Sequence, residues 1–334
     1  MLKLLLKNLL KMEVQMFKIK ENTNVKGRDL KLSVVETLID IIDSDDKVIA
    51  LEADLGGASS FTKIQQAKEN NFVQCGISEA NMMGTAAGLS LTGFTPFVHT
   101  FSPFATRRCF DQIYMSGAYA NNTINIYGSD PGFCTGPNGG THTSWEDVAL
   151  MRTIPNAVVC DGADDTQVEW IIREFAKLKG IHYLRANRKP VYDIYEKGST
   201  FELGKGNLLK EGKDILIITA GQILKEALDA AEILEKDGYS VSVIDMFCIK
   251  PLDANLIIKE SKDKKVVVTF ENHSIIGGLG SAVSEVLAEN SVATKFKRIG
   301  ANDVFGQVGS QDYLQKEFGL TKEHLVEEIN LLLS

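Results

Sequence analysis

Short apolar runs alternate with longer amphipathic segments along most of this chain. The segments at residues 30–42, 80–92, 103–119 and 166–177 space their apolar residues as helices do. Runs with the length and composition of buried strands separate them, at residues 48–51, 72–77, 95–101, 123–127, 157–160 and 182–185. Strands that alternate with helices predict a parallel sheet covered by helices on both faces.

A second series of the same kind follows a less regular stretch. Residues 190–207 carry Pro, Gly and charged residues with little periodicity, and we interpret them as a linker. Beyond them, strands are expected at residues 214–219, 240–246, 265–270 and 294–299, with helices at residues 223–236, 252–261 and 278–288. We therefore predict two doubly wound α/β domains, residues 28–189 and 208–334, after an N-terminal extension of residues 1–27.

The composition is typical of a globular protein. The 334 residues suit two compact domains, and 44% of them are hydrophobic while 24% are charged. The net charge of −8 argues against a nucleic-acid partner or an anionic membrane, and no apolar run reaches membrane-spanning length. Five scattered cysteines without a Cys-x-x-Cys pair predict buried thiols in a cytoplasmic protein, and the isolated histidines predict no metal site on this chain.

Residues 1–11 form a short, basic and apolar N-terminus. Lysines interrupt its apolar runs and no small-residue cleavage site follows, so we expect an amphipathic helix rather than a signal peptide. Initiation at Met12 or Met16 is an open alternative, and we assign this stretch no function.

The most informative motif is Gly76-Ile77-Ser78-Glu79, which ends a predicted strand and starts an apolar helix. A carboxylate in such surroundings is costly to desolvate unless another group shares its proton, and this suits it to proton transfer. The alternative is an exposed glutamate in the first helical turn, stabilised by the helix dipole.

A second candidate is the glycine-rich loop of residues 130–142, which follows a predicted strand, where ligand sites of α/β sheets lie. Its glycines allow the backbone to approach a ligand. His142 could donate to an oxyanion or transfer protons, or it could be satisfied by neighbouring backbone. Ser144 and Asp147 then form a capping-box-like pattern that predicts the start of a helix.

Aromatic and basic residues offer further contacts. Phe101 and Phe104 can present ring faces to a planar heterocycle, although most such pairs belong to a core. Arg107 and Arg108 are adjacent on a predicted helix, so at most one of them points into a site. Arg185, at the end of a strand, is the better anion clamp. The glycine run at residues 277–280 lacks the full dinucleotide fingerprint, so helix packing is its expected role.

In this order and spacing, these elements resemble the C-terminal half of a transketolase encoded as a separate subunit. The resemblance covers residue 28 to the end of the chain. It implies a pyrimidine-binding domain followed by a transketolase C-terminal domain. The matching stretches are Asp54-Leu55, residues 76–79, Thr100-Phe101, residues 110–113, Gly140-Thr141-His142 and residues 271–281.

The resemblance implies thiamine diphosphate as the cofactor. Glu79 would hydrogen-bond N1′ of the aminopyrimidine and exchange a proton with it. Phe101 and Phe104 would wall the pyrimidine pocket, and Asp54 matches a further cofactor-binding position. His142 would contact substrate oxygens and assist proton transfer. The substrate-binding residues implied in the same way are Arg185, Arg28, Ser129, Asn138 and Arg107.

The resemblance also implies a partner. Thiamine enzymes hold the diphosphate through Mg²⁺ on a Gly-Asp-Gly segment of a neighbouring domain, and this sequence contains no Gly-Asp-Gly. We therefore expect a transketolase N-terminal subunit that carries the diphosphate and Mg²⁺ site. The active site would form between two kinds of chain, in an α2β2 assembly, and this chain alone would be inactive.

Two departures from the family pattern bear on the substrate. Asn138 stands where familiar transketolases have an acidic residue, and Ser129 lies near the position of a phosphate-contacting histidine. The resemblance implies transfer of a two-carbon ketol unit from a ketose to an aldose. With an altered anion site, the expected donor is a phosphorylated or sulfonated ketose other than the usual pentose phosphate.

Other functions stay open. The β subunit of a 2-oxo acid dehydrogenase has a similar length and cofactor, but residues 140–142 and 271–281 follow the transketolase pattern. A 1-deoxyxylulose-5-phosphate synthase-like enzyme usually keeps both halves on one chain. A non-catalytic subunit would not need Glu79, His142 and Arg185 together. A nicotinamide-dependent dehydrogenase is more remote, because its glycine fingerprint is incomplete here.

Overall fold

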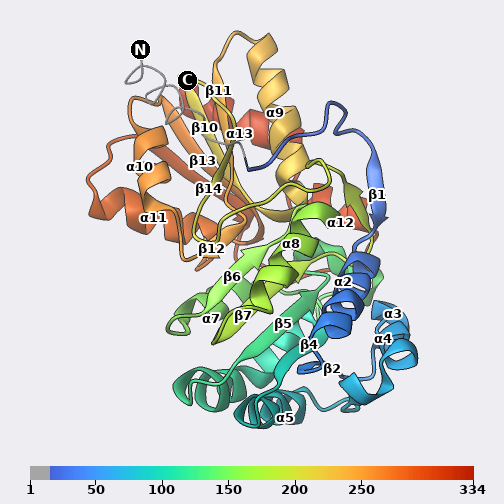
Figure 1. Cartoon of the computed structure of the whole chain (residues 1–334). Coiled ribbons are helices and arrows are strands. Elements are labelled where there is room, and N and C mark those ends of the chain that lie inside the picture. Colours follow the sequence, from blue (N-terminus) through green and yellow to red (C-terminus); the bar gives the residue numbers. More distant parts are fainter. Residues whose placement is uncertain (1–15) are drawn as a thin grey trace, which may run out of the picture.

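The computed structural model describes residues 16–334, so the expectations for residues 1–11 lie outside it. It contains two largely parallel sheets with helices on both faces, as the sequence predicts. In Figure 1 the first sheet and its helices occupy the lower part of the molecule, and the second sheet occupies the upper part. Within the described range, no helix combines the length and the apolar character needed to cross a membrane.

The first sheet has seven strands in the order β12-β6-β7-β5-β4-β2-β3. One edge strand of this sheet, β12 (Cys248–Lys250), comes from the second half of the sequence. It pairs antiparallel with β6. The two halves of the chain therefore share this sheet. The other six strands are mutually parallel: β2 (Val48–Glu52), β3 (Phe72–Gln74), β4 (Thr95–Phe101), β5 (Ile124–Ser129), β6 (Val158–Asp161) and β7 (Ile181–Ala186).

Successive strand residues of the first sheet are buried by helices on opposite faces, because side chains alternate along a strand. Phe97 of β4 packs in the cluster that contains α2 (Leu30–Ser44) and α8 (Asp165–Phe175). Val98, the next residue, packs in the cluster that contains α5 (Glu79–Leu91). The shorter elements of this half are α3 (Gly56–Ser59), α4 (Thr62–Ala67), η1 (Glu69–Asn71), η4 (Gly132–Asn138) and α7 (Asp147–Thr153).

The helix expected at residues 103–119 is broken into three pieces. These are α6 (Ser102–Ala105), the 3-10 turn η2 (Arg107–Cys109) and the π-helical η3 (Gln112–Tyr119). The break lies at Thr106, whose backbone leaves the helical region with φ −120° and ψ −78°. As a result, the side chains of this segment do not follow the spacing of one continuous helix.

Two further expectations are corrected. The helix after the glycine-rich loop begins at Asp147 with Glu146 as its N-cap, not at Ser144. The segment interpreted as a linker contains the short strand β8 (Pro190–Tyr192), which pairs antiparallel with β1 (Lys26–Asp29). Neither strand has the apolar alternation that would reveal it in the sequence: β1 has no buried residue, and β8 buries only Val191, which packs in the core.

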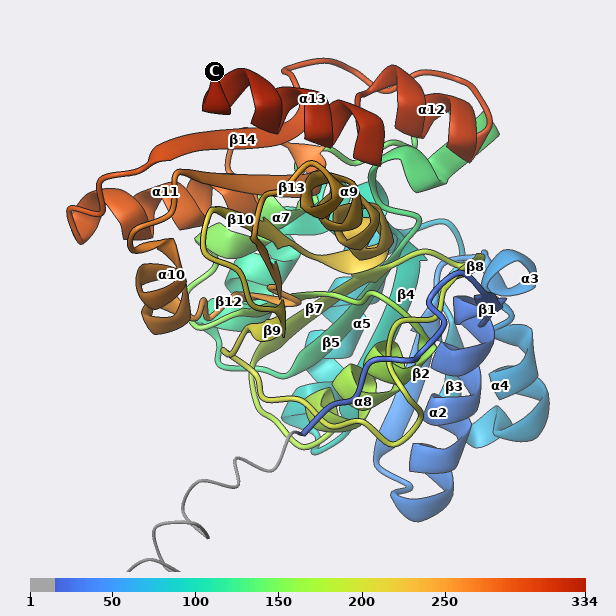
Figure 2. The same ribbon diagram turned by 90° about the horizontal axis from the view of Figure 1, so that it is seen from above.

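The second sheet has the order β14-β13-β10-β11-β9, with β9 antiparallel to β11. Helices α9 and α13 share the core cluster of one face, and α10 and α11 share that of the other. Figure 2 shows α12 and α13 along the outer side of this half. The elements are β9 (Asn207–Lys210), β10 (Ile215–Thr219), η5 (Gly221–Ile223), α9 (Leu224–Lys236), β11 (Val241–Asp245), α10 (Ala254–Ser261), β13 (Val266–Ser274), α11 (Leu279–Glu289), β14 (Lys295–Ala301), α12 (Gln311–Glu317) and α13 (Lys322–Leu333).

Candidate active site

Most of the predicted site residues lie at the carboxyl edge of the first sheet. Asp54 follows β2, Glu79 follows β3, and Phe101 ends β4. The chain passes from β2 to β3 on one side and then to β4 on the other, so the strand order reverses at β2. Ligands of open α/β sheets bind at such a reversal, outside the carboxyl ends of the strands.

Glu79 is the first residue of α5, and only 3% of its surface is exposed. The alternative of an exposed first-turn glutamate is therefore wrong. Its Oε1 accepts a hydrogen bond of 2.7 Å from Nη1 of Arg108, whose side chain is 44% exposed. The carboxylate thus lies at the positive end of the helix dipole with a single ion-pair partner that itself reaches solvent.

Beside Glu79, three rings form what we call the aromatic row: Phe104, His142 and Phe101. The His142 ring stands edge-on to Phe104, with 5.0 Å between centroids, and to Phe101, with 5.8 Å. Arginines flank the row at both ends. The Cζ atom of Arg108 lies 3.8 Å from the Phe104 centroid, and that of Arg188 lies 4.7 Å from the Phe101 centroid.

His142 is only partly buried, and its Nδ1 lies 2.9 Å from the hydroxyl oxygen of Thr141. Partial burial, together with the positive charge of Arg108, lowers the pKa of His142 below its ordinary value. The imidazole is therefore neutral at pH 7, so one of its nitrogens is free of a proton. A neutral, partly exposed histidine can accept a proton from a ligand hydroxyl.

Other predicted residues lie on the rim. Asp54 is exposed, and its backbone N–H donates to Oε1 of Gln74, which also accepts from the N–H of Gly76. Gln74 therefore ties the end of β2 to the loop that leads to Glu79. Arg107 forms a 2.8 Å ion pair with Glu146. The other rim residue is Asn138, exposed at the end of η4.

Arg185 does not fit its predicted role as an anion clamp. Only 1% of it is exposed, and its guanidinium donates to Asp147 at 2.8 Å, to Asp161 at 2.8 Å and to the backbone oxygen of Asn272 at 2.9 Å. Strand β7 continues to Ala186, so Arg185 lies inside the strand and beneath the second half of the chain. A guanidinium with these partners has no face left for a substrate.

Ser129 lies beside Phe101 in the register of β5 with β4, whereas Arg28 lies on the side of α2 and α8. Ser129 is fully buried, with its Oγ 3.0 Å from Nε2 of His99, and Nδ1 of His99 lies 3.3 Å from Glu52. Arg28 is bound by Glu36 and, at 3.2 Å, by Asp165, on the side of α2 and α8. Both side chains are thus engaged by residues of this chain, and their roles in substrate binding stay predictions. The sequence analysis did not identify the buried Glu52 and His99.

Arg188 is the site residue that sequence reasoning missed. It is the first arginine beyond the carboxyl end of β7, and Asp130 binds its side chain at 2.6 and 2.8 Å. The signal was present in the spacing, because a ligand-facing side chain must lie past the end of a buried strand rather than within it.

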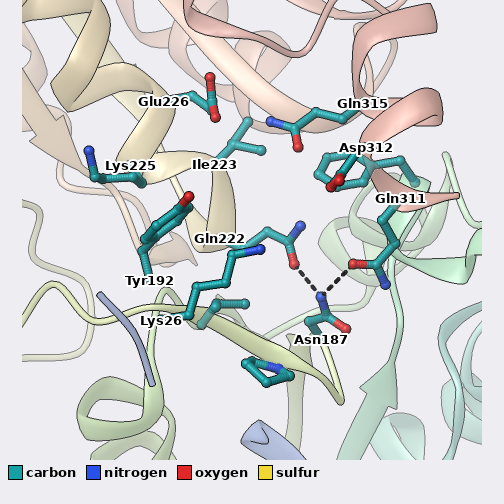
Figure 3. Close-up of a pocket in the computed structure, with 13 residues that line it drawn as sticks. Lys26, Asn187, Tyr192, Gln222, Ile223, Lys225, Glu226, Gln311, Asp312 and Gln315 are labelled. Atoms are coloured by element: carbon teal, nitrogen blue, oxygen red, sulfur yellow. Dashed lines mark hydrogen bonds between the residues drawn. The ribbon is translucent and has the colours of Figure 1, made fainter. Parts of the chain in front are cut away.

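A recess at the junction of the two halves supports the loop that carries Arg188 (Figure 3). The amide nitrogen of Asn187 donates to Oε1 of Gln222 at 2.8 Å and to Oε1 of Gln311 at 3.3 Å. The cavity measures about 50 Å³, which is room for one or two waters rather than a sugar. These two hydrogen bonds fix Asn187, the residue next to Arg188.

The glycine run has the packing role that was expected. The backbone N–H groups of Leu279 and Gly280, at the start of α11, donate to the buried carboxylate of Glu271 at 2.7 and 2.9 Å. A Cβ atom on Gly278 or Gly280 would collide with that carboxylate. The carboxyl group of Glu271 therefore occupies the N-terminus of α11.

The aromatic row with Glu79 fits an aminopyrimidine ring. A buried carboxylate oxygen supplies the acceptor, and the face of Phe104 supplies a stacking surface. Residues 16–334 contain no group of three or more His, Cys, Asp or Glu side chains arranged to hold a metal ion.

Known proteins share both halves of this structure. The family model for the transketolase pyrimidine binding domain matches residues 27–192, and the model for the transketolase C-terminal domain matches residues 204–325. A 6-deoxy-6-sulfo-D-fructose transketolase subunit from Clostridium sp. (strain MSTE9) is 41% identical over 297 residues, which are 89% of this chain and 92% of that protein. An apulose-4-phosphate transketolase subunit from Phocaeicola vulgatus is 32% identical over 87% of this chain and 93% of that protein.

A solved structure agrees with these matches. It is described as a split gene transketolase, inactive beta4 tetramer, and it superimposes with a TM-score of 0.85 at 36% identity. The match covers 92% of this chain and 99% of that one. Family models and relatives together therefore account for nearly the whole described structure. The chain belongs to the transketolase family, as a C-terminal subunit of a split transketolase.

Proposed function

We propose that this chain, joined to a transketolase N-terminal subunit, transfers a two-carbon ketol unit from a ketose to an aldose acceptor. The observation that carries the proposal is the buried carboxylate of Glu79 beside the aromatic row. When bound, thiamine diphosphate supplies the carbon nucleophile that takes up and releases the two-carbon unit. The residues of this chain bind the pyrimidine ring and move protons around it.

Glu79 has the burial that its role requires, because a carboxyl group shielded from water can give a proton to a ring nitrogen and recover it without exchange with solvent. The face of Phe104 would support one side of the ring, with Phe101 further along the aromatic row. His142, neutral at pH 7, would accept a proton from a substrate hydroxyl. Asp54, which is exposed just after β2, is proposed as a cofactor contact by resemblance.

We propose that the diphosphate and Mg²⁺ are held by the partner subunit in an α2β2 assembly. The two subunit relatives are matched over 92% and 93% of their own lengths, so they too are partial enzymes of this size. The sequence has no Gly-Asp-Gly segment of the kind that thiamine enzymes use for this metal. Activity should therefore require both kinds of chain.

We propose a ketose that bears a phosphate or a sulfonate as the donor. Two arginines, Arg107 and Arg188, lie around the aromatic row and supply the charge that an anionic sugar needs. In this role Arg188 replaces Arg185, the arginine that was expected from the sequence. The names of the relatives describe one protein acting on a sulfonated sugar and one acting on a phosphorylated sugar.

The test is ketol transfer by the complex of this chain with its N-terminal subunit, over a panel of sulfonated, phosphorylated and uncharged ketoses. We expect transfer with a lower KM for anionic donors, and none from this chain alone. A clear preference for xylulose 5-phosphate would overturn the substrate proposal. Turnover of a 2-oxo acid, or formation of a deoxyketose from pyruvate, would instead favour the dehydrogenase or synthase alternative.

A further inference from the structure

Arg108 contacts both features that a pyrimidine ring would need. Its Nη1 donates to Oε1 of Glu79 at 2.7 Å, and its Cζ lies 3.8 Å from the centroid of the Phe104 ring. A guanidinium is planar, carries N–H donors along its edge and stacks on aromatic faces. An aminopyrimidine is also planar and would hydrogen-bond the same carboxylate. The arginine therefore presents to Glu79 and Phe104 much the same shape as the cofactor ring.

We propose that Arg108 is a gate that occupies the place of the cofactor ring, and that thiamine diphosphate binds only when the Arg108 side chain leaves. The proposal rests on the proposed function, because it takes thiamine diphosphate as the ligand. The exclusion is steric. The guanidinium and the ring of Phe104 are already at the contact distance of about 3.5–4.0 Å, so no ring fits between them.

The gate has a reason in the chemistry of Glu79. A carboxylate that is 3% exposed would be left without a charged partner if neither the cofactor nor an arginine were present. Buried charges without partners are strongly unfavourable. Arg108 keeps Glu79 paired until the ring of the cofactor brings its own hydrogen-bonding groups. One partner then replaces the other.

Arg108 is also placed so that it can move. Its side chain is 44% exposed, and it projects from the three-residue turn η2 rather than from a long helix. Its neighbour Arg107 is held by Glu146, which fixes the turn while the Arg108 side chain rotates into solvent. Only the Arg108 end of the ion pair reaches solvent, so water can hydrate the guanidinium as it leaves the carboxylate and the ring.

The experiment measures cofactor affinity in the complex with the N-terminal subunit. Thiamine diphosphate is titrated calorimetrically at saturating Mg²⁺ and without sugar, into wild type and Arg108→Ala. We expect the variant to bind the cofactor roughly 3- to 30-fold more tightly, because the competing ion pair and stacking contact are gone. Arg173→Ala on α8 is the matched control, since Arg173 is a half-exposed arginine paired with Asp40 and Glu169. It should leave the affinity unchanged.

A gain in affinity is a result that damage to the fold would not produce. Unchanged or weaker binding by Arg108→Ala would overturn the gate, because it would mean that Arg108 stays on Glu79 beside the bound ring. If that variant does not assemble, Arg108→Lys keeps the charge but loses the planar stack, and it should bind the cofactor more tightly by a smaller factor. Equal affinity in Arg108→Lys would also overturn the gate. A wild-type complex that binds no thiamine diphosphate would overturn the proposed function as well.

Discussion

Two arginine–carboxylate clusters lie in the first half of the molecule and differ in how completely the protein closes them. In the first, Arg185 is 1% exposed and binds two aspartates and a backbone oxygen. In the second, Arg108 is 44% exposed and binds one carboxylate and one ring face. The first is complete without a ligand. The second holds its carboxylate with a partner that can be exchanged.

How completely an arginine is buried and paired distinguishes a structural arginine from a functional one better than the residue type does. Both arginines lie in or beside apolar elements of the chain, and both bind acidic residues. The closed cluster joins the two halves, because Asn272 and His273 come from β13, and Nε2 of His273 lies 3.8 Å from Asp147. The open cluster instead ends in the solvent-exposed guanidinium of Arg108. Variants of the open cluster should therefore change turnover, and variants of the closed cluster should change stability.

Replacing the carboxylate of the open cluster should have the largest effect. Glu79→Gln keeps the size of the side chain but cannot exchange a proton, so we expect turnover by the reconstituted complex to fall by about 10²–10⁴. Stability should change by less than about 1 kcal/mol, because the amide oxygen of Gln can still accept a hydrogen bond from Arg108 and the substitution removes a buried charge. Glu169→Gln on α8 is the control. Unchanged turnover in Glu79→Gln would favour a non-catalytic subunit.

Breaking the closed cluster should act on folding instead. Arg185→Met leaves Asp147 and Asp161 buried without their counter-charge, which should lower the free energy of unfolding by about 3–5 kcal/mol. Arg108→Ala should cost less, because it leaves one carboxylate without its charged partner rather than two, and because Arg108 itself is 44% exposed. Urea unfolding of both variants, with Arg173→Met as a surface control, measures the contrast. Equal losses for Arg185→Met and Arg108→Ala would show that the two clusters do not differ in kind.

A third prediction concerns pH. Burial raises the pKa of Glu271 from 4.5 to about 7, so between these values the folded state keeps a proton that the unfolded chain has released. The stability from this group is complete below about pH 4.5 and is lost as the pH rises through 7. The change is about 3 kcal/mol. Glu271→Gln should flatten the stability curve between pH 5 and 7, whatever its effect at one pH.

The exposed residue Glu289, at the end of α11, is the control for this titration. Glu289→Gln should leave the slope of stability against pH as in the wild type. Parallel curves for the wild type and Glu271→Gln would contradict the prediction, because they would show that Glu271 does not change its proton binding on folding.

The smallest effect is expected for Arg188, at the Phe101 end of the aromatic row. Arg188→Gln should raise the KM of an anionic ketose about tenfold, since a charge-assisted contact contributes about 1.5 kcal/mol or more and Asp130 already shares the guanidinium. The KM of an uncharged ketose should change little, and this comparison within one variant is the control. Equal shifts for both sugars would mean that Arg188 does not face the anion.

The sequence predicted those elements whose burial depends on residues close to them in the sequence. The strand at residues 95–101 was expected with the bounds that β4 has, because the stretch is short and rich in aromatic and β-branched residues. Glu79 could be found because a strand that leads directly into an apolar helix fixes where its side chain lies. Arg185 was preferred to Arg188 because the expected strand ended at residue 185, whereas β7 continues to Ala186 and Asp147 and Asn272, distant in the sequence, bury Arg185. The break at Thr106 likewise depends on packing rather than on helix propensity.

The antiparallel pairing of Cys248 in β12 with Cys160 in β6 has a consequence for dividing this protein. A fragment that ended between the two family modules would leave β6 as a bare edge, whose free N–H and C=O groups invite pairing with other chains. The modules are separate in sequence comparisons, but they are one folding unit in three dimensions. A half-protein cut at their boundary should aggregate, and restoring residues 248–250 should protect it.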